Sequence, residues 1–227
     1  MSTAPSANVY LSGRTVDDYQ RMFSLTGRDL KGRSILDCPA GSSDFALRAR
    51  MLGAEVVSVD PLFDHDVDDL AWRVRQDRER LVDNIGRSPE MFRPGAADRY
   101  RSWAMPQEEF LADYARDRVK GTRHYVAAAL PVLPFEDQSF DLALSAFLLF
   151  SYHALFDLSW HVQALAEMLR VAHTVQIHPL EEGASRALYS HYRALQDALP
   201  GFEFTTKSID NLCYLHASTT LTIRPRN

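Results

Sequence analysis

The chain alternates between short apolar runs and longer stretches in which apolar residues recur at helical spacing. Short apolar runs bounded by turn residues are typical of buried strands, whereas apolar positions every three or four residues indicate helices with one buried face. We predict strands over residues 34–39, 54–61, 124–130, 140–150 and 174–180, and helices over residues 43–53, 158–172 and 185–201. Residues 202–209 and 217–225 alternate between apolar and polar positions with no helix between them, which predicts an antiparallel pair.

Two stretches interrupt this alternation. Residues 16–25 carry apolar side chains at helical spacing ahead of the first strand, so residues 1–30 are expected to form an N-terminal helical cap. Residues 63–123 show amphipathic helical patterns. These patterns are broken by turn residues at Ser88-Pro89, Pro94-Gly95 and Pro106. We therefore expect a helical insertion between the second and third strands of a single domain, residues 1–227, and we expect it to cover a substrate site as a lid.

Strands that are joined through helices run parallel, with helices covering both faces of their sheet. The final pair adds two strands at one edge, the last of them antiparallel. The predicted fold is an α/β domain with a seven-stranded, mostly parallel sheet. In such sheets, ligands bind at the carboxyl ends of the strands, where the strand order reverses.

Composition narrows the class of protein and the kind of partner. The 227 residues are 46% hydrophobic and 24% charged, which are ordinary values for a soluble globular domain. A net charge of -5 provides no basic surface for nucleic acid or an anionic membrane, and no apolar run is long enough to span a bilayer. The two cysteines, Cys38 and Cys213, match no zinc spacing, so no metal site is expected. We expect a cytoplasmic monomer or homodimer that acts on a small molecule.

The segment DCPAGSSDF, residues 37–45, follows the first predicted strand and opens the first helix, which is the position of a nucleotide-binding turn. Asp60 ends the second strand, and a carboxylate about 20 residues past such a turn can accept hydrogen bonds from ribose hydroxyls. A dinucleotide needs several glycines so that its pyrophosphate can approach the backbone, and this turn has only Gly41. S-adenosylmethionine carries no phosphate and has a cationic sulfonium, so a turn with one glycine and the acidic Asp37 suits it better.

Four segments, SILDCPAGSSDF, VVSVDP, LPFEDQSFDLALSAFLLF and AEMLRV, resemble in their order and spacing the class I S-adenosylmethionine-dependent methyltransferases. LPFEDQSFDLAL is the most specific of them, since it is similar to the LPFxDxSFDxV segment of the branch that methylates small molecules. LSGRTVDDYQRMF together with ILDCPAG also resembles a group of bacterial methyltransferase-like proteins. The resemblance covers residues 10–62 and 124–223, and it implies a Rossmann-like methyltransferase fold with S-adenosylmethionine as cofactor.

The resemblance also implies roles for seven residues around the cofactor. They are Asp37, Pro39 and Gly41 at the methionyl group, Asp60 at the ribose, Pro61 and Leu130 at the adenine, and Ser145 beside the reactive centre. Ala129 stands where the family usually has an acidic residue near the adenine amine. Loss of that acceptor costs about 1 to 3 kcal/mol if the amine is buried unpaired, and almost nothing if water replaces it. The family's usual Pro-Gly-Gly after AEMLRV is replaced by AHTV, so the helix must turn directly into the fifth strand.

Other residues are candidates because of their position. Arg14 and Tyr19 precede the first strand, where they could fold over the cofactor, and we expect Arg14 to pair with the methionyl carboxylate. The alternative for Arg14 is an ordinary surface arginine. His153 follows the fourth strand and His178 ends the fifth, so both join Ser145 as catalytic candidates, and either imidazole could act as a general base. Each histidine could instead serve only as a structural hydrogen-bonding residue.

The sequence thus predicts an enzyme that transfers a methyl group from S-adenosylmethionine to an oxygen or nitrogen atom of a small molecule. The alternative is a non-catalytic protein of the same fold that binds S-adenosylmethionine or S-adenosylhomocysteine as a regulator or partner. A short-chain dehydrogenase is disfavoured, because Tyr189 is followed at the fourth position by Arg193 rather than by a lysine. The acids from Asp64 to Asp69 indicate the N-terminus of a helix rather than a metal site.

Overall fold

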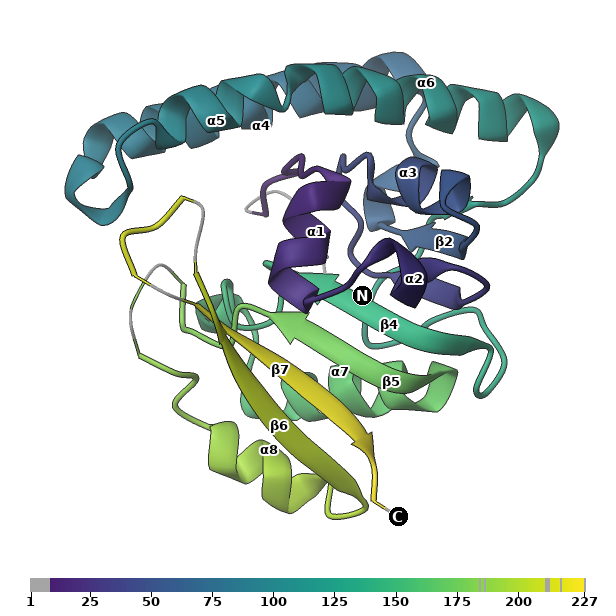
Figure 1. The fold of residues 1–227 in the computed structure, drawn as a ribbon, viewed down its shortest axis with the longest axis vertical. Coiled ribbons are helices and arrows are strands. Elements are labelled where there is room, and N and C mark those ends of the chain that lie inside the picture. Colours follow the sequence, from purple (N-terminus) through teal and green to yellow (C-terminus); the bar gives the residue numbers. More distant parts are fainter. Residues whose placement is uncertain (1–8, 184, 186, 211–212, 217, 227) are drawn as a thin grey trace.

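The computed structural model describes residues 9–183, 185, 187–210, 213–216 and 218–226. Its centre is a seven-stranded sheet in the order β3-β2-β1-β4-β5-β7-β6 (Figure 1). The strands are β1 (Ser34–Asp37), β2 (Glu55–Val59), β3 (Tyr125–Val126), β4 (Phe140–Ala146), β5 (Ala172–His178), β6 (Phe202–Ile209) and β7 (Ser218–Pro225). Strands β1 to β5 run parallel, and β7 lies antiparallel between β5 and β6. The predicted fold class is confirmed.

Helices cover both faces of this sheet. One face carries α1 (Val16–Phe23), α2 (Gly27–Leu30) and α3 (Phe45–Met51), and the other carries α7 (Leu158–Val171) and α8 (Tyr192–Ala198). The neighbouring residues Ile35 and Leu36 of β1 point to opposite faces, where Ile35 packs in the cluster of Phe45 and Leu36 in the cluster of Leu165. No helix in the described part of the chain is long and apolar enough to cross a membrane.

The stretch between β2 and β3 is helical, as predicted. It contains α4 (Val67–Arg87), α5 (Ala96–Ser102) and α6 (Ala104–Lys120), with short 3-10 turns at Pro61–Asp64 and Pro89–Met91. The three helices pack on one another and form a layer at one end of the molecule, beyond α1 and α3 (Figure 1). Asp66 caps α4 by accepting a hydrogen bond from the Asp69 N–H, so acids of this stretch stabilise a helix N-terminus.

The break predicted at Pro106 lies elsewhere. The helix is interrupted at Trp103, between α5 and α6, and Pro106 belongs to the first turn of α6. Proline is tolerated in a first turn because its missing N–H has no helical partner there.

Several predicted elements are shorter in the structure, and β4 ends at Ala146 instead of at the predicted residue 150. β3 keeps only Tyr125–Val126 of the predicted 124–130, and α8 keeps only Tyr192–Ala198 of its predicted range. By contrast, the direct turn from α7 into β5 that was predicted from the absence of Pro-Gly-Gly is confirmed. α7 ends at Val171 and β5 begins at Ala172.

Candidate functional site

The turn between β1 and α3 is covered by residues 9–15, which we call the N-terminal segment. Gly41 has a φ of +60°, and a Cβ there would lie 2.7 Å from the Ser12 carbonyl oxygen, so only glycine fits without strain. The Ser42 N–H donates to that same carbonyl at 3.2 Å, and the Asp44 N–H donates to a carbonyl of the segment at 3.2 Å. The amides that would hold a phosphate at the start of α3 are therefore bonded within the protein. This arrangement does not suit the pyrophosphate of a dinucleotide.

A cavity of about 400 Å³, the first cavity, opens at the carboxyl ends of β1 to β4. Its volume lies in the range of small-molecule sites. Its lining is Val9, Tyr10, Leu11, Cys38, Pro39, Val59, Asp60, Pro61, Leu62, Ala128, Ala129, Leu130, Pro131, Leu148, Phe156 and Trp160. Among these residues Asp60 has the one carboxylate, so the cavity combines apolar walls with a single acidic group.

Asp60 joins the end of β2 to the turn after β1. Its Oδ1 accepts from the Leu62 N–H at 3.0 Å, and its Oδ2 accepts from the Gly41 N–H at 3.2 Å. Burial raises the pKa of this carboxyl to about 6, although the two amide bonds act in the opposite direction. At neutral pH it is therefore mostly ionised, and each oxygen keeps a lone pair that can accept from a ligand hydroxyl.

Four of the predicted cofactor residues line the first cavity, and they come from three different connections of the sheet. They are Pro39, Asp60, Pro61 and Leu130. Ala129 also lines it, so the position at which the family usually carries an acid faces this cavity.

Four other predicted residues line none of the three cavities described here. Tyr19 donates its hydroxyl to Asp37 Oδ1 at 2.9 Å, and burial raises the pKa of Asp37 to about 8, against the effects of Tyr19 and Arg14. This pair is packed between α1 and β1. Ser145 is fully buried, and Gly41 lies against the N-terminal segment instead of open space. These four residues line no described cavity, so their contacts with the cofactor stay predictions.

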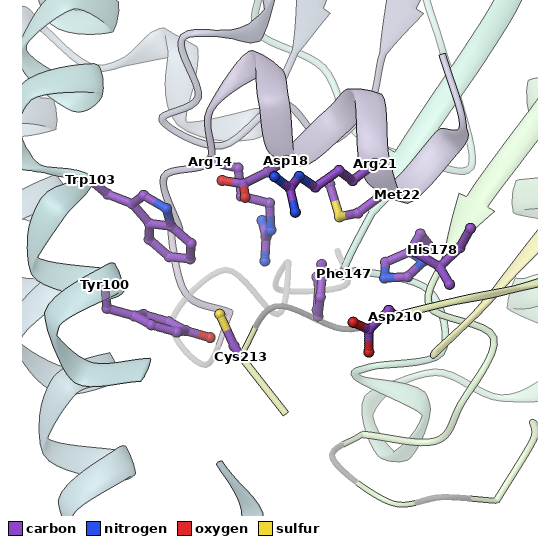
Figure 2. Close-up of a pocket in the computed structure, with 11 residues that line it drawn as sticks. Arg14, Asp18, Arg21, Met22, Tyr100, Trp103, Phe147, His178, Asp210 and Cys213 are labelled. Atoms are coloured by element: carbon purple, nitrogen blue, oxygen red, sulfur yellow. The ribbon is translucent and has the colours of Figure 1, made fainter. Parts of the chain in front are cut away.

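A second cavity, of about 290 Å³, adjoins the first, and Tyr10 lines both. It lies between the N-terminal segment, the insertion helices and the connections that follow β4 and β6. Its lining is Tyr10, Ser12, Arg14, Leu81, Asn84, Ser88, Met91, Phe92, Tyr100, Phe147, Ser151, Tyr152, Gly183 and Tyr214. A third cavity, of about 40 Å³, shares Arg14, Tyr100 and Phe147 with it (Figure 2).

Arg14 extends into the third cavity between the rings of Trp103 and Phe147 (Figure 2). Its guanidinium carbon lies 4.0 Å from the ring centroid of Phe147 and 5.8 Å from that of Trp103. Its Nη1 donates to Ser12 Oγ at 2.7 Å. The structure thus places Arg14 in the second and third cavities, and not among the residues that line the first.

His178 lines the third cavity and is 2% exposed. The Thr220 hydroxyl donates to the Met22 carbonyl at 2.6 Å, so it must accept from His178 Nδ1, which lies 2.8 Å away. Nδ1 therefore carries the proton and Nε2 has the free lone pair. Burial and the charge of Arg14 lower the pKa of His178 to about 3. A group of such low basicity is a weak general base at neutral pH, and it serves better as a hydrogen-bond acceptor.

The three predicted catalytic residues do not meet in one cavity. His153 lies in a 3-10 turn, with its Nδ1 3.3 Å from the Phe150 carbonyl, and it lines none of the three cavities. Ser145 is buried inside the sheet, and His178 faces the third cavity. The separate catalytic roles of these residues stay predictions.

Several lining residues were missed by sequence analysis. Phe147 and Leu148 follow β4 directly, so the rule that ligands bind after parallel strands could have found them. Phe147 has a φ of +56°, an uncommon value for a phenylalanine and typical of functional sites. The Tyr10 N–H donates to Tyr152 Oη at 3.0 Å, across 142 positions of sequence, and no local pattern predicts such a contact.

Comparison with known proteins identifies the fold. No known family model matches the chain. The uncharacterized protein MJ0045 of Methanocaldococcus jannaschii is 23% identical over 171 residues, which are 75% of this chain and 77% of that protein. The structure of magnesium protoporphyrin IX methyltransferase from Synechocystis PCC 6803 with bound S-adenosylmethionine matches with a TM-score of 0.50. The match has 12% sequence identity and covers 93% of this chain and 78% of that one.

The chain has the methyltransferase fold. A second structure, 1,6-didemethyltoxoflavin-N1-methyltransferase from Burkholderia thailandensis, matches with a TM-score of 0.49 and 15% identity, covering 91% of this chain and 77% of that one. In the methyltransferase fold of this chain, the first and second cavities both open where parallel strands end, which is where α/β folds bind their ligands.

Proposed function

We propose that this protein transfers a methyl group from S-adenosylmethionine to a small molecule. The observation that carries the proposal is the pair of adjoining cavities at the carboxyl ends of the strands, the first of which holds Asp60. A donor and an acceptor bound in these two cavities would meet at Tyr10. The likeness to a methyltransferase solved with S-adenosylmethionine supports the same assignment.

The residues of the first cavity suit a nucleoside that carries no phosphate. Asp60 can accept hydrogen bonds from both ribose hydroxyls, and Pro61 and Leu130 provide apolar walls for the adenine. Pro39 and Leu148 would then lie towards the methionyl end. When bound, S-adenosylmethionine supplies a methyl group on a sulfonium, and loss of that methyl leaves a neutral thioether.

The protein's own part in such a reaction is mainly alignment and exclusion of water. Binding in the second cavity would hold the acceptor next to the donor, which removes much of the entropic cost of bringing the two molecules together. The apolar walls of the first cavity and the insertion helices beside the second would shield the reacting groups from water, which competes as a nucleophile. No residue has to form a covalent bond with the substrate.

Calorimetry with S-adenosylhomocysteine tests the proposal through Asp60. The wild-type protein should bind this product, and Asp60→Asn should weaken binding by on the order of tenfold or more, because a charged acceptor is lost. Asp64→Asn is the matched control, since Asp64 is exposed, belongs to the same connection and lines none of the cavities. If the wild-type protein binds neither S-adenosylmethionine nor S-adenosylhomocysteine at millimolar concentration, the proposal is wrong.

A second candidate function is a binding protein that does not catalyse methyl transfer. Ala129 favours it, because a wall of the first cavity lacks the acid that the family usually places near the adenine amine. The methyltransferase and the binding protein differ in whether they form a methylated product. A screen of acceptors with methyl-labelled S-adenosylmethionine should yield labelled product if the protein is an enzyme, and only stoichiometric binding if it is not.

A further inference from the structure

The second cavity combines aromatic rings with one cationic group. The rings of Phe92, Tyr100, Phe147 and Tyr214 contribute to its walls, and Arg14 is the one charged residue among its described lining. None of its described lining residues carries a carboxylate. A cavity with this lining favours a planar ligand with negative charge.

The charge of Arg14 is not neutralised by the acids near it. No ion pair found in the described residues includes Arg14. Asp18 and Asp210 line the third cavity, and each of them pairs with another arginine. Burial raises the pKa of Asp37 to about 8, so this acid is mostly uncharged at neutral pH. Arg14 therefore presents an uncompensated positive charge to a half-buried space.

The hydroxyl groups of the second cavity are also available as donors. Tyr152 Oη accepts from the Tyr10 N–H at 3.0 Å, and Tyr10 Oη accepts from Asn84 Nδ2 at 2.9 Å. Each of these two oxygens keeps its own O–H hydrogen, which can be donated to a ligand. Ser151 Oγ is buried with no partner among the described residues. The cavity therefore offers several donors to an anion, in addition to the guanidinium.

We infer that the second cavity binds a planar aromatic compound with a carboxylate, which pairs with Arg14 while the ring packs against Phe147. That this compound is the methyl acceptor rests on the proposed function, whereas its binding does not. A volume of about 290 Å³ accommodates a molecule of one or two rings. No strong base that could remove a proton from the acceptor lines the cavity. An acceptor whose attacking oxygen is already ionised, as in a carboxylate, needs no such base.

The test compares matched pairs of probes on the full chain. Hydroxybenzoates and the corresponding hydroxybenzamides have nearly the same shape but differ in charge, and their dissociation constants can be measured by ligand-observed nuclear magnetic resonance. At least one acid should bind about tenfold or more tightly than its amide, because only the acid pairs with a guanidinium. Equal affinities for acid and amide throughout the set would overturn the inference.

Substitution of Arg14 is the second part of the test. Arg14→Gln should abolish the preference for the acid, and Arg14→Lys should keep part of it, since a point charge replaces a bidentate one. Arg28→Gln is the control, because Arg28 is an exposed arginine on α2. Thermal unfolding checks that each variant is folded. If Arg14→Gln does not fold, Arg14→Lys and the acid–amide comparison on the wild type still decide the question.

The outcomes separate this inference from the proposed function. Acid binding that depends on Arg14, in a protein that binds no S-adenosylhomocysteine, would contradict the proposed function and support the inference. If Arg14→Gln weakens binding of S-adenosylhomocysteine and leaves acid binding unchanged, Arg14 acts on the methionyl carboxylate and the inference is wrong. Unchanged binding of both ligands would also overturn it.

Discussion

Asp37 makes the stability of the protein depend on pH. Its carboxyl is 1% exposed, and burial raises its pKa from 3.8 to about 8. Between these values the folded state keeps a proton that the unfolded chain has released, so stability contributed by this group is lost as pH rises towards 8. An asparagine has no charge to bury, and its Oδ1 can still accept the hydrogen bond from Tyr19.

Asp37→Asn should therefore stabilise the protein, with a gain that grows as pH rises. Thermal unfolding of the variant and the wild type at several values between pH 5 and pH 9 measures the difference in unfolding temperature. Asp60, whose pKa is also raised, is present in both proteins and largely cancels in the comparison. A gain of equal size at every pH would contradict a raised pKa for Asp37.

Gly41 is the point of closest approach between the turn after β1 and the N-terminal segment. Gly41→Ala should destabilise the protein by about 1 to 3 kcal/mol, because alanine is strained at a positive φ and its Cβ would collide with Ser12. Gly86→Ala is the matched control: nothing lies within 4 Å of a Cβ at this position in α4, so a gain of up to about 1 kcal/mol is expected. Urea unfolding measures both. Similar changes for the two variants would show that the turn and the segment are not in close contact.

Among the elements, those that the sequence predicts well are the ones whose burial is regular. β4 is covered on both faces, since Ala143 packs in one core cluster and Leu142 and Leu144 pack in the other. β3 was predicted too long, because the residues after Val126 are equally apolar but form a wall of the first cavity instead of pairing in the sheet. An apolar run shows that a segment is buried, and it does not distinguish a strand from a cavity wall.

The insertion is attached to the rest of the domain through ion pairs that differ in burial. Arg50 of α3 pairs with Asp113 of α6, and their side chains are 16% and 14% exposed. Asp113 also accepts from the Tyr125 hydroxyl at 2.7 Å. Arg48 pairs with Glu109 on the same two helices, with side chains 37% and 33% exposed. The first pair is therefore the stronger attachment of α6 to the sheet layer.

Replacing Arg50 should cost more stability than replacing Arg48. Arg50→Gln leaves the half-buried Asp113 with only the more exposed Arg116, 3.2 Å away, as a cationic partner, at about 1 to 3 kcal/mol. Arg48→Gln removes a solvent-screened pair worth about 0 to 1 kcal/mol. Free energies of unfolding in urea test the order. Equal costs for the two substitutions would show that burial of the first pair does not matter to the attachment of the insertion.

At the scale of the whole molecule, one segment makes long-range contacts that the sequence did not predict. The N-terminal segment covers the turn after β1, contacts α4 and the connection after β4, and lines the first and second cavities. These contacts join parts of the chain that lie far apart in sequence, and neither spacing nor periodicity encodes them. The candidate site could be predicted where it follows the strand ends, at Pro39, Asp60, Pro61 and Leu130, but not where this segment closes it.

Asp77 is the main attachment of this segment to the insertion. It is fully buried on α4, and its Oδ2 accepts from the Leu11 N–H at 2.9 Å and from Arg73 Nε at 2.6 Å. Asp77→Ala leaves the Leu11 amide without an acceptor, so the segment should open more often than the core unfolds. Asp83→Ala is the control, because Asp83 is exposed on the same helix.

Hydrogen exchange of single backbone amides measures this opening. In Asp77→Ala, the Leu11, Ser42 and Asp44 amides should exchange on the order of tenfold faster, since all three are bonded to or from the N-terminal segment. Amides of β4 and β5 should be unaffected, because their hydrogen bonds lie inside the sheet. S-adenosylhomocysteine should slow exchange of the same three amides if it binds against the segment in the first cavity. If all amides of the variant exchange faster together, the segment is not a separate unit, and the two cavities open only when the whole domain unfolds.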